Sequence, residues 1–142
     1  MSVKHILAQK GRNIEAIGPD TKLAQAILHL ASKRIGALLV IDAANSIVGI
    51  LSERDIIRAL VAGSHALEDN VRDHMTEFVV TCSLDTSVGE VMDIMTRGRF
   101  RHVPVIADND VVGIVSIGDV VKHRLAEMES EKSAIIAYIA AG

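Results

Sequence analysis

The sequence predicts a mixed α/β fold made of two copies of one β-α-β-β-α unit. The main observation is an internal repeat: residues 48–58 return as residues 112–122, both with the pattern Val-Gly-Ile-x-Ser-x-x-Asp. Upstream segments also match, because residues 37–41 correspond to 102–106 and residues 20–23 to 85–88. Hydrophobic periodicity alternates between strand and helix within each copy. Each copy is therefore one supersecondary unit.

Two such units are expected to share a single body. A unit of about 60 residues is marginal alone, so packing two face to face about a pseudo-twofold axis would give an adequate core. The repeat places the first unit, with an N-terminal helix, at residues 1–65 and a connector at 66–75. The second unit, with an extended C-terminal helix, is expected at 76–142.

The strands are predicted from short apolar runs bounded by turn residues. Each unit is expected to begin with a short strand and to continue, after a helix, into a hairpin. The predicted strands are Ile14–Ile17, Ala37–Ile41 and Ile47–Leu51 in the first unit, and Val79–Thr81 followed by the matching hairpin in the second.

The helices are predicted from their start signals and apolar faces. Helix-start chemistry lies at residues 19–21 and 85–87, and a closing helix is expected from Ser52, ended by Gly63-Ser64, and from Ser116. The last helix is expected to run almost to Tyr138. Its candidates for contact with another chain are Met128, Ile135 and Ile139. The apolar faces comprise Leu23, Ala26, Ile27 and Leu30, and Val88, Val91, Met92 and Met95, with both methionines expected in the core.

Composition excludes several classes of function. The net charge of −3, with three aromatic residues in the chain, argues against a nucleic-acid-binding surface. A single cysteine, Cys82, excludes an internal disulfide and is expected to be an inert core thiol in a reducing compartment. No apolar run is long enough for a membrane span, and the N-terminus lacks signal-peptide character. A cytoplasmic protein is expected, without a metal site or catalytic motif. His123 and Glu127 are expected to form a surface pair.

Ser-x-x-Asp occurs twice, as Ser52/Asp55 and Ser116/Asp119, each time between a strand and a helix. The structural interpretation is a capping box, in which Ser accepts from a free N–H and the acid lies in the first helical turn. The functional interpretation uses the same geometry: phosphate binds at the helix N-terminus and the carboxylate accepts ribose hydroxyls. The structural and the functional interpretation are compatible with each other. Arg97 and Arg99 fit a solvated helix end.

These residues resemble a tandem pair of cystathionine-β-synthase (CBS) domains from about Ile14 to Leu125. The resemblance rests on the repeated Val-Gly-Ile-x-Ser-x-x-Asp and on residues 101–105, Arg-His-Val-Pro-Val. It implies that the units pack through their sheets, with helices outside, and leave two clefts. In this family the clefts often bind AMP, ADP, ATP, NAD or S-adenosyl compounds, so the implied role is regulation of a partner.

The resemblance also implies site residues. In one cleft Asp119 would bind ribose and Ser116 phosphate, beside Arg101 and His102; the adenine end would be lined by Asn13, Ile14, Glu15, Ile35, Gly36 and Ala37. The second cleft would use Asp55, Ser52 and Arg54, with Thr76, Phe78 and Phe100 contributed across the pseudo-twofold. Gly36 and Ala37 match Arg101 and His102, and Gly118 matches Arg54, so the clefts are unequal. The Asp119 cleft is favoured.

Two main hypotheses follow. The first is a regulatory sensor of AMP, ADP, ATP or NAD(H) with no required cofactor, working as a homodimer on an unknown effector protein. The dimer would form through the CBS faces and the C-terminal helix. The second is a protein-interaction scaffold without a physiological ligand. An enzyme acting on a nucleotide is the weakest alternative, because no activated nucleophile or tuned carboxylate pair can be placed.

Overall fold

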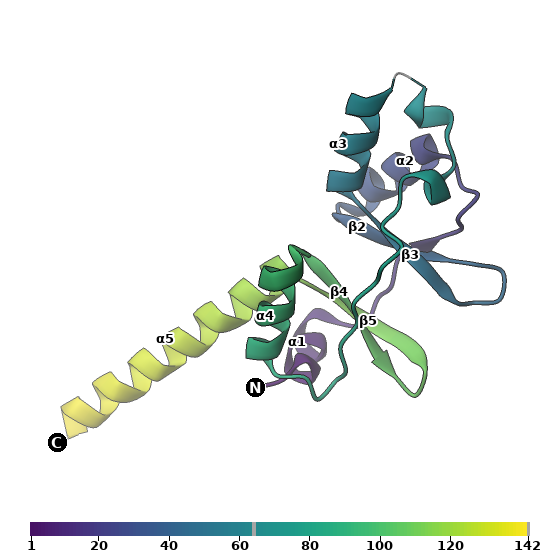
Figure 1. The fold of residues 1–142 in the computed structure, drawn as a ribbon. Coiled ribbons are helices and arrows are strands. Elements are labelled where there is room, and N and C mark those ends of the chain that lie inside the picture. The colour runs from purple at the N-terminus through teal and green to yellow at the C-terminus, as the bar shows by residue number, and fades with distance from the viewer. Residues whose placement is uncertain (64, 142) are drawn as a thin grey trace. The chain divides into compact units, whose positions relative to one another are not determined.

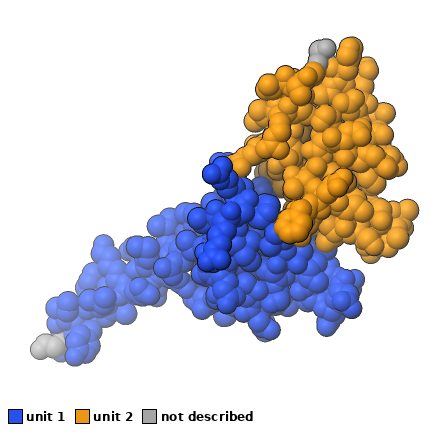
Figure 2. All heavy atoms as spheres, viewed as in Figure 1, with its two compact units in different colours: residues 1–13, 80–142 blue, residues 14–79 orange. Residues whose placement is uncertain are grey.

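The computed structural model describes residues 1–63 and 65–141, which pack into two units. Unit 1 comprises residues 1–13 and 80–142, and unit 2 comprises residues 14–79 (Figure 2). This division differs from the boundaries expected from the repeat, because the N-terminal segment packs with the second half. Val3, Ile6 and Leu7 are buried in the same core cluster as Val103 and Val115. The first thirteen residues thus complete the core of unit 1.

Unit 2 has the predicted β-α-β-β-α order (Figure 1). Its elements are β1 (Ala16–Ile17), α2 (Leu23–Lys33), β2 (Ala37–Ile41), β3 (Ile47–Ser52) and α3 (Glu53–Ala62). The sheet order is β1-β2-β3, with β1 parallel and β3 antiparallel to β2. The first strand is shorter than the predicted Ile14–Ile17. Just before β1, the Glu15 carbonyl still accepts a backbone hydrogen bond from the Leu39 N–H of β2, at 3.1 Å.

The segment expected to be a connector is part of the core of unit 2. It forms two short 3₁₀ helices, η1 (Ala66–Glu68) and η2 (Val71–Asp73), whose Ala66 and Val71 are buried in the core cluster. Further on, Thr76 exchanges two backbone hydrogen bonds of 2.9 Å with Ile50. Residues 66–76 therefore close this unit. Gly63 caps α3 as predicted, while Ser64 lies outside the described residues.

Unit 1 contains α1 (Val3–Lys10), α4 (Val88–Gly98), β4 (His102–Ala107), β5 (Asp110–Ser116) and α5 (Ile117–Ala141). Its β4 and β5 form the predicted antiparallel hairpin. The strand predicted at Val79–Thr81 is wrong. Instead Cys82 alone forms a parallel bridge, donating to the Pro104 carbonyl at 2.9 Å and accepting from the Ile106 N–H at 2.8 Å.

The two first helices of the repeat begin differently. Ser87 caps α4 by accepting from the Glu90 N–H at 3.1 Å, as the sequence predicted. In unit 2 the prediction at residues 19–21 is wrong, because α2 begins after Lys22, which makes no side-chain cap. The Leu23 N–H instead donates to the Asp69 carbonyl of the segment after η1, at 2.9 Å. A backbone carbonyl from a distant segment thus replaces the side-chain cap.

The glycine of the repeated Val-Gly-Ile leaves room for a different neighbour in each unit. A Cβ on Gly49 would lie 2.8 Å from the Thr76 carbonyl oxygen and 2.7 Å from the Met75 sulfur. A Cβ on Gly113 would lie 2.8 Å from a methyl group of Leu7. The small residue therefore lets residues 75–76 approach β3 and lets α1 approach β5.

Helix α5 extends beyond the rest of unit 1 (Figure 1). Every residue from Met128 to Ala141 is exposed. Met92, predicted to be a core residue, is 40% exposed on α4, whereas Met95 is buried as predicted. No described helix is both long enough and apolar enough to cross a membrane.

Candidate functional site

In unit 1, Ser116 and Asp119 form the predicted box at the junction of β5 and α5. The Ser116 N–H donates to Oδ2 of Asp119 at 2.8 Å, and the Asp119 N–H donates to Oγ of Ser116 at 3.2 Å. These reciprocal bonds satisfy backbone groups that the helix start would otherwise leave free. The capping interpretation is therefore correct for this pair, and it holds the carboxylate in the first turn of α5.

Lys10 adds a cation that the sequence reasoning missed. Its ammonium donates to Asp119 Oδ2 at 2.6 Å and to the Ile114 carbonyl at 2.6 Å. Lys10 is the last residue of α1 and lies outside the repeat, so neither spacing nor internal symmetry pointed to it. The Lys10 side chain remains 34% exposed and that of Asp119 22% exposed. The pair therefore lies at the surface of unit 1, within reach of solvent and small solutes.

The charge state of Asp119 follows from these contacts. Burial raises the pKa of this carboxyl, but the hydrogen bond and charge of Lys10 and the Ser116 backbone N–H lower it by more. The net effect is a pKa below the ordinary value of 3.8. Asp119 is consequently a carboxylate at neutral pH, which can only accept hydrogen bonds.

The corresponding Asp55 of unit 2 is more completely enclosed. Its Oδ2 accepts from the Ser52 N–H at 2.9 Å and from the Ser52 hydroxyl at 3.1 Å. Its Oδ1 accepts from the Thr76 hydroxyl at 3.0 Å and lies 3.7 Å from the Arg58 guanidinium. Asp55 is only 5% exposed. Both carboxylate oxygens are thus engaged within unit 2.

The structure brings together four predicted residues of the favoured cleft at one end of the β4–β5 hairpin. His102 is the first residue of β4 and lies opposite Ser116 in the ladder. The Arg101 carbonyl accepts from the Ile117 N–H at 2.8 Å, which ties the exposed Arg101 to the start of α5. Arg101, His102, Ser116 and Asp119 therefore share one edge of unit 1. The Phe100 ring occupies the space beside Gly98.

The predicted residues of unit 2 lie in several places. Glu15 is half-buried and forms a 2.8 Å pair with His29. Thr76, expected to reach the Asp55 cleft across the pseudo-twofold, belongs to the same unit as Asp55 and donates its hydroxyl to that carboxylate at 3.0 Å. The other predicted residues divide by exposure: Ile14, Ile35 and Gly36 are half-buried and Ala37 is buried, whereas Arg54 and Phe78, like Asn13 of unit 1, are exposed.

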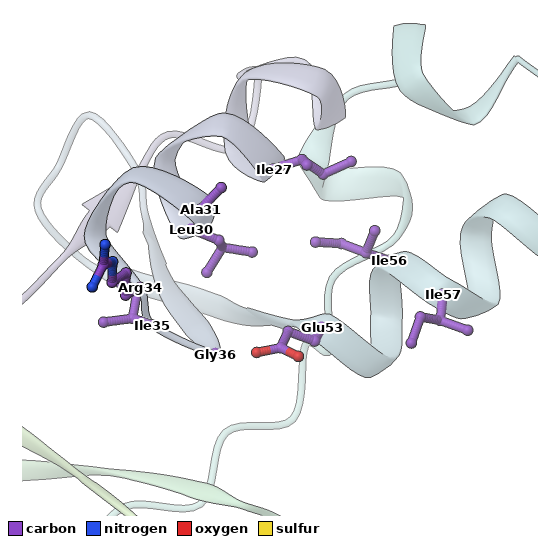
Figure 3. A pocket seen from close by; sticks show the side chains of 9 residues that line it. All are labelled: Ile27, Leu30, Ala31, Arg34, Ile35, Gly36, Glu53, Ile56 and Ile57. Atoms are coloured by element: carbon purple, nitrogen blue, oxygen red, sulfur yellow. The ribbon is translucent and has the colours of Figure 1, made fainter.

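A hollow of about 490 Å³ lies between α2 and α3 of unit 2, at the start of β2 (Figure 3). Two predicted adenine-site residues, Ile35 and Gly36, line it. The Gly36 carbonyl accepts from the Glu53 N–H at 3.0 Å, which joins the start of β2 to the start of α3. The remaining lining residues are Ile27, Leu30, Ala31, Arg34, Glu53, Ile56 and Ile57. The predicted clefts combine residues of both units and stay a prediction.

Two other titratable residues lie in the core of unit 1. His123 and Glu127 lie beside each other as predicted, but the predicted surface location of this pair is wrong, because His123 is only 7% exposed. It lies three residues after the buried Val120, on the packed face of α5, with Nε2 3.5 Å from the Glu127 carboxylate. Cys82 is buried as predicted, and burial raises the pKa of its thiol to about 11. The described residues contain no cluster of three metal-ligating side chains.

Comparison with known proteins gives a consistent result. The family model of the CBS domain matches the chain twice, at residues 3–62 and 71–126. A CBS-domain protein from Agrobacterium tumefaciens is 43% identical, with a TM-score of 0.85, and the match covers 87% of this chain and 92% of that one. The CBS pair of protein MJ0100, in complex with 5-methylthioadenosine and S-adenosyl-L-methionine, is 27% identical. Its TM-score is 0.79, with 89% and 98% of the two chains covered.

A third solved structure, CBSX2 in complex with AMP, is 26% identical with a TM-score of 0.70. The match covers 83% of this chain and 92% of that chain. The ligands named for these two complexes share an adenosine moiety.

Proposed function

The chain belongs to the CBS domain family, with both repeats matched, and we propose that it is a regulatory module that binds an adenosine-containing ligand. Two solved relatives that share its fold are complexes with such ligands. The repeated Ser-x-x-Asp supplies the same kind of polar group in each unit. The proposed role is recognition of the ligand and transmission of its presence to a separate effector protein, without catalysis.

The observation that carries this proposal is the state of Asp119. It is ionised, partly exposed and fixed at the start of a long helix by Ser116. A ribose presents two adjacent hydroxyl donors, and an acceptor-only carboxylate is the matching group. The helix start also favours a negatively charged phosphate. Asp119 can therefore accept hydrogen bonds from the ribose hydroxyls. The proposed phosphate ligands are Ser116, Arg101 and His102.

Asp55 is proposed to serve mainly the structure of unit 2. Both of its oxygens already accept hydrogen bonds, and Thr76 covers one of them. Because Asp55 is only 5% exposed, a ligand hydroxyl would have to displace the Ser52 or Thr76 donor, and a buried donor left unpaired costs free energy. The asymmetry seen in the sequence therefore has a counterpart in burial. We propose that the Asp119 site binds more tightly than the Asp55 site.

Calorimetric titration of the full chain tests the proposal. The ligands are AMP, ADP, ATP, NAD⁺, NADH, S-adenosylmethionine and 5′-methylthioadenosine. Asp119→Asn, which keeps the side-chain size, should lower the affinity for the best ligand about 10- to 100-fold, as expected for loss of a charge-assisted bond. Asp93→Asn is the matched control, because Asp93 is an exposed acid on α4 of the same unit. Unchanged affinity in Asp119→Asn would contradict the ribose assignment.

A second candidate function is an interaction scaffold without a ligand. It is favoured by the exposed apolar side chains of α5, including Leu125, Ile135 and Tyr138. Absence of heat with all seven ligands, together with loss of self-association when residues 127–142 are deleted, would support it over the sensor. Turnover of a bound nucleotide by the purified chain would instead revive an enzymatic role. We also propose that the protein is located in the cytoplasm.

A further inference from the structure

The exposed part of α5 carries apolar side chains at heptad spacing. From residue 121 onward, alternating steps of four and three lead through six positions, five of which are apolar. These five are between 49% and 70% exposed: Val121, Leu125, Met128, Ile135 and Ile139. Lys132 occupies the remaining position, which is the fourth of the six along the helix. A strict repeat of 3.5 residues is typical of a coiled-coil seam rather than of a helix packed on a globular core.

In the described part of unit 1, no side chain from residue 128 to residue 141 is buried or half-buried. Residues 128–141 are exposed all round, although they continue as one helix from the packed first turns of α5. A helix of about this length is marginal in water on its own, and most helices in proteins are stabilised by packing one apolar face. The distal half of α5 therefore needs a surface that covers its seam.

We propose that this seam pairs with the same seam of a second copy of the chain, as a parallel two-stranded coiled coil. Leu125, Lys132 and Ile139 take the a positions, and Val121, Met128 and Ile135 take the d positions. The charged residues beside the seam indicate that its partner is a second copy of the chain and that the two helices run parallel.

Arg124 then falls at position g and Glu129 at the following position e. In a parallel pair, residue g of one helix faces the following e of the other, so each Arg124 meets a Glu129 of the second copy, twice by symmetry. An antiparallel pair with full overlap would instead set Glu129 against Glu129 and Glu131 against Glu131. In the structure Arg124 donates to Glu127 on its own helix at 2.7 Å, so the dimer exchanges this exposed guanidinium's partner for Glu129 of the second copy.

Lys132 explains how the register is fixed. A single lysine at an a position costs stability but specifies alignment and favours a defined oligomer. Its alkyl stem can pack in the seam while its ammonium reaches the flanking Glu131 of the second copy. The lysine thus disfavours registers shifted by one heptad, in which it would lie against Leu125 or Ile139 and beside Arg124 or Tyr138, without an acidic partner.

The oligomeric state of the full chain tests this proposal, measured by analytical ultracentrifugation over a range of concentrations. Wild type should be a dimer. Ile135→Lys, at a seam position, should weaken dimerisation at least about 100-fold. Ala137→Lys is the matched control, because it adds the same charge two residues away on the opposite face and should leave the dimer intact. Lys132→Leu should tighten the dimer.

A monomeric wild type would overturn the proposal, and so would an Ile135→Lys variant that dimerises like wild type, since the dimer would then form elsewhere. Direction is tested by cysteine cross-linking. Ile135→Cys should form a disulfide-linked dimer under mild oxidation, because d positions face each other only in the parallel pair. Wild type is the control, since its Cys82 is buried. Cross-linking only between Leu125→Cys and Ile135→Cys chains would overturn the parallel direction. Ligand affinity is measured separately, so these outcomes do not depend on the proposed function.

Discussion

Lys10 and Asp119 are 109 residues apart in sequence, and their ammonium and carboxylate groups lie 2.6 Å apart. The contact joins the last residue of α1 to the first turn of α5, and a second bond ties the same ammonium to the Ile114 carbonyl of β5. A helix outside the repeat therefore sets the electrostatics of the candidate ribose site. In the proposed ribose site, ligand hydroxyls would have to share the Asp119 carboxylate with Lys10 or displace the lysine.

Replacement of Lys10 by Met should lower stability at neutral pH by about 1 kcal/mol, because the pair is only partly buried and the aliphatic stem is retained. The folded-state pKa of Asp119 is depressed, so its contribution is present above the unfolded-state pKa and is lost as pH falls through the folded value. Urea unfolding of both proteins, followed by circular dichroism from pH 7 to pH 2.5, measures this.

The difference between wild type and Lys10→Met should therefore shrink as pH falls below about 4. The double variant Lys10→Met/Asp119→Asn completes the cycle and isolates the pairwise coupling. A difference that stayed constant down to the lowest pH would mean that the lost stability comes from packing of the lysine stem and not from the ion pair.

Replacement of Asp55 by Ala should destabilise unit 2 by about 2–3 kcal/mol, because it removes a buried charged acceptor and leaves Ser52 and Thr76 without their partner. Thr76→Val removes one of these bonds and should cost about 1–2 kcal/mol. Denaturant unfolding measures both. Glu77→Ala is the control, since Glu77 is an exposed acid of the same unit. Equal stability of Asp55→Ala and Glu77→Ala would refute the structural role given to Asp55.

The two glycines of the repeat should respond unequally to alanine. A Cβ at residue 49 meets the Thr76 backbone, which cannot move without breaking its ladder bonds to Ile50. Gly49→Ala should therefore cost about 1–3 kcal/mol, in the range of overpacked cores. A Cβ at residue 113 meets only the end of the Leu7 side chain, which can change rotamer, so Gly113→Ala should cost less. Thermal unfolding of the two variants ranks them, and the reverse order would contradict this account.

Cys82 should be a slow nucleophile. Burial raises the pKa of its thiol to about 11, so at pH 8 only about one molecule in a thousand carries the reactive thiolate. Reaction of native protein with a thiol reagent such as iodoacetamide should be far slower than that of urea-unfolded protein, followed by mass spectrometry. Labelling at equal rates in both states would show that the bridge between Cys82 and Val105 opens readily.

The sequence predicted the hairpins, the closing helices and the Ser-x-x-Asp boxes because each rests on local chemistry. Apolar runs with turn residues define β2 and β3, and Ser52 and Ser116 mark helix starts without help from distant residues. The predicted strand at residues 79–81 failed because pairing depends on a distant partner, and only Cys82 reaches β4. The start of α2 was misplaced for the same reason, since its first N–H bonds to Asp69.

The candidate site was predictable to the extent that the repeat contains it. Asp119, Ser116 and His102 lie on segments that both copies share, and the hairpin ladder brings them together. Lys10 was not predictable, because α1 has no counterpart in the second copy. His123 was misjudged since the four-residue spacing to Glu127 fits both a surface pair and a packed face, and only the contacts of α5 decide between them.

The order in which the chain is synthesised has a consequence for unit 1. Residues 1–13 are translated before unit 2, yet the strands that bury Val3, Ile6 and Leu7 are translated only after the whole of it. Unit 2 is contiguous and can fold during translation, while α1 remains without its partners for that time. The nascent chain therefore carries an uncovered apolar segment until β5 is made.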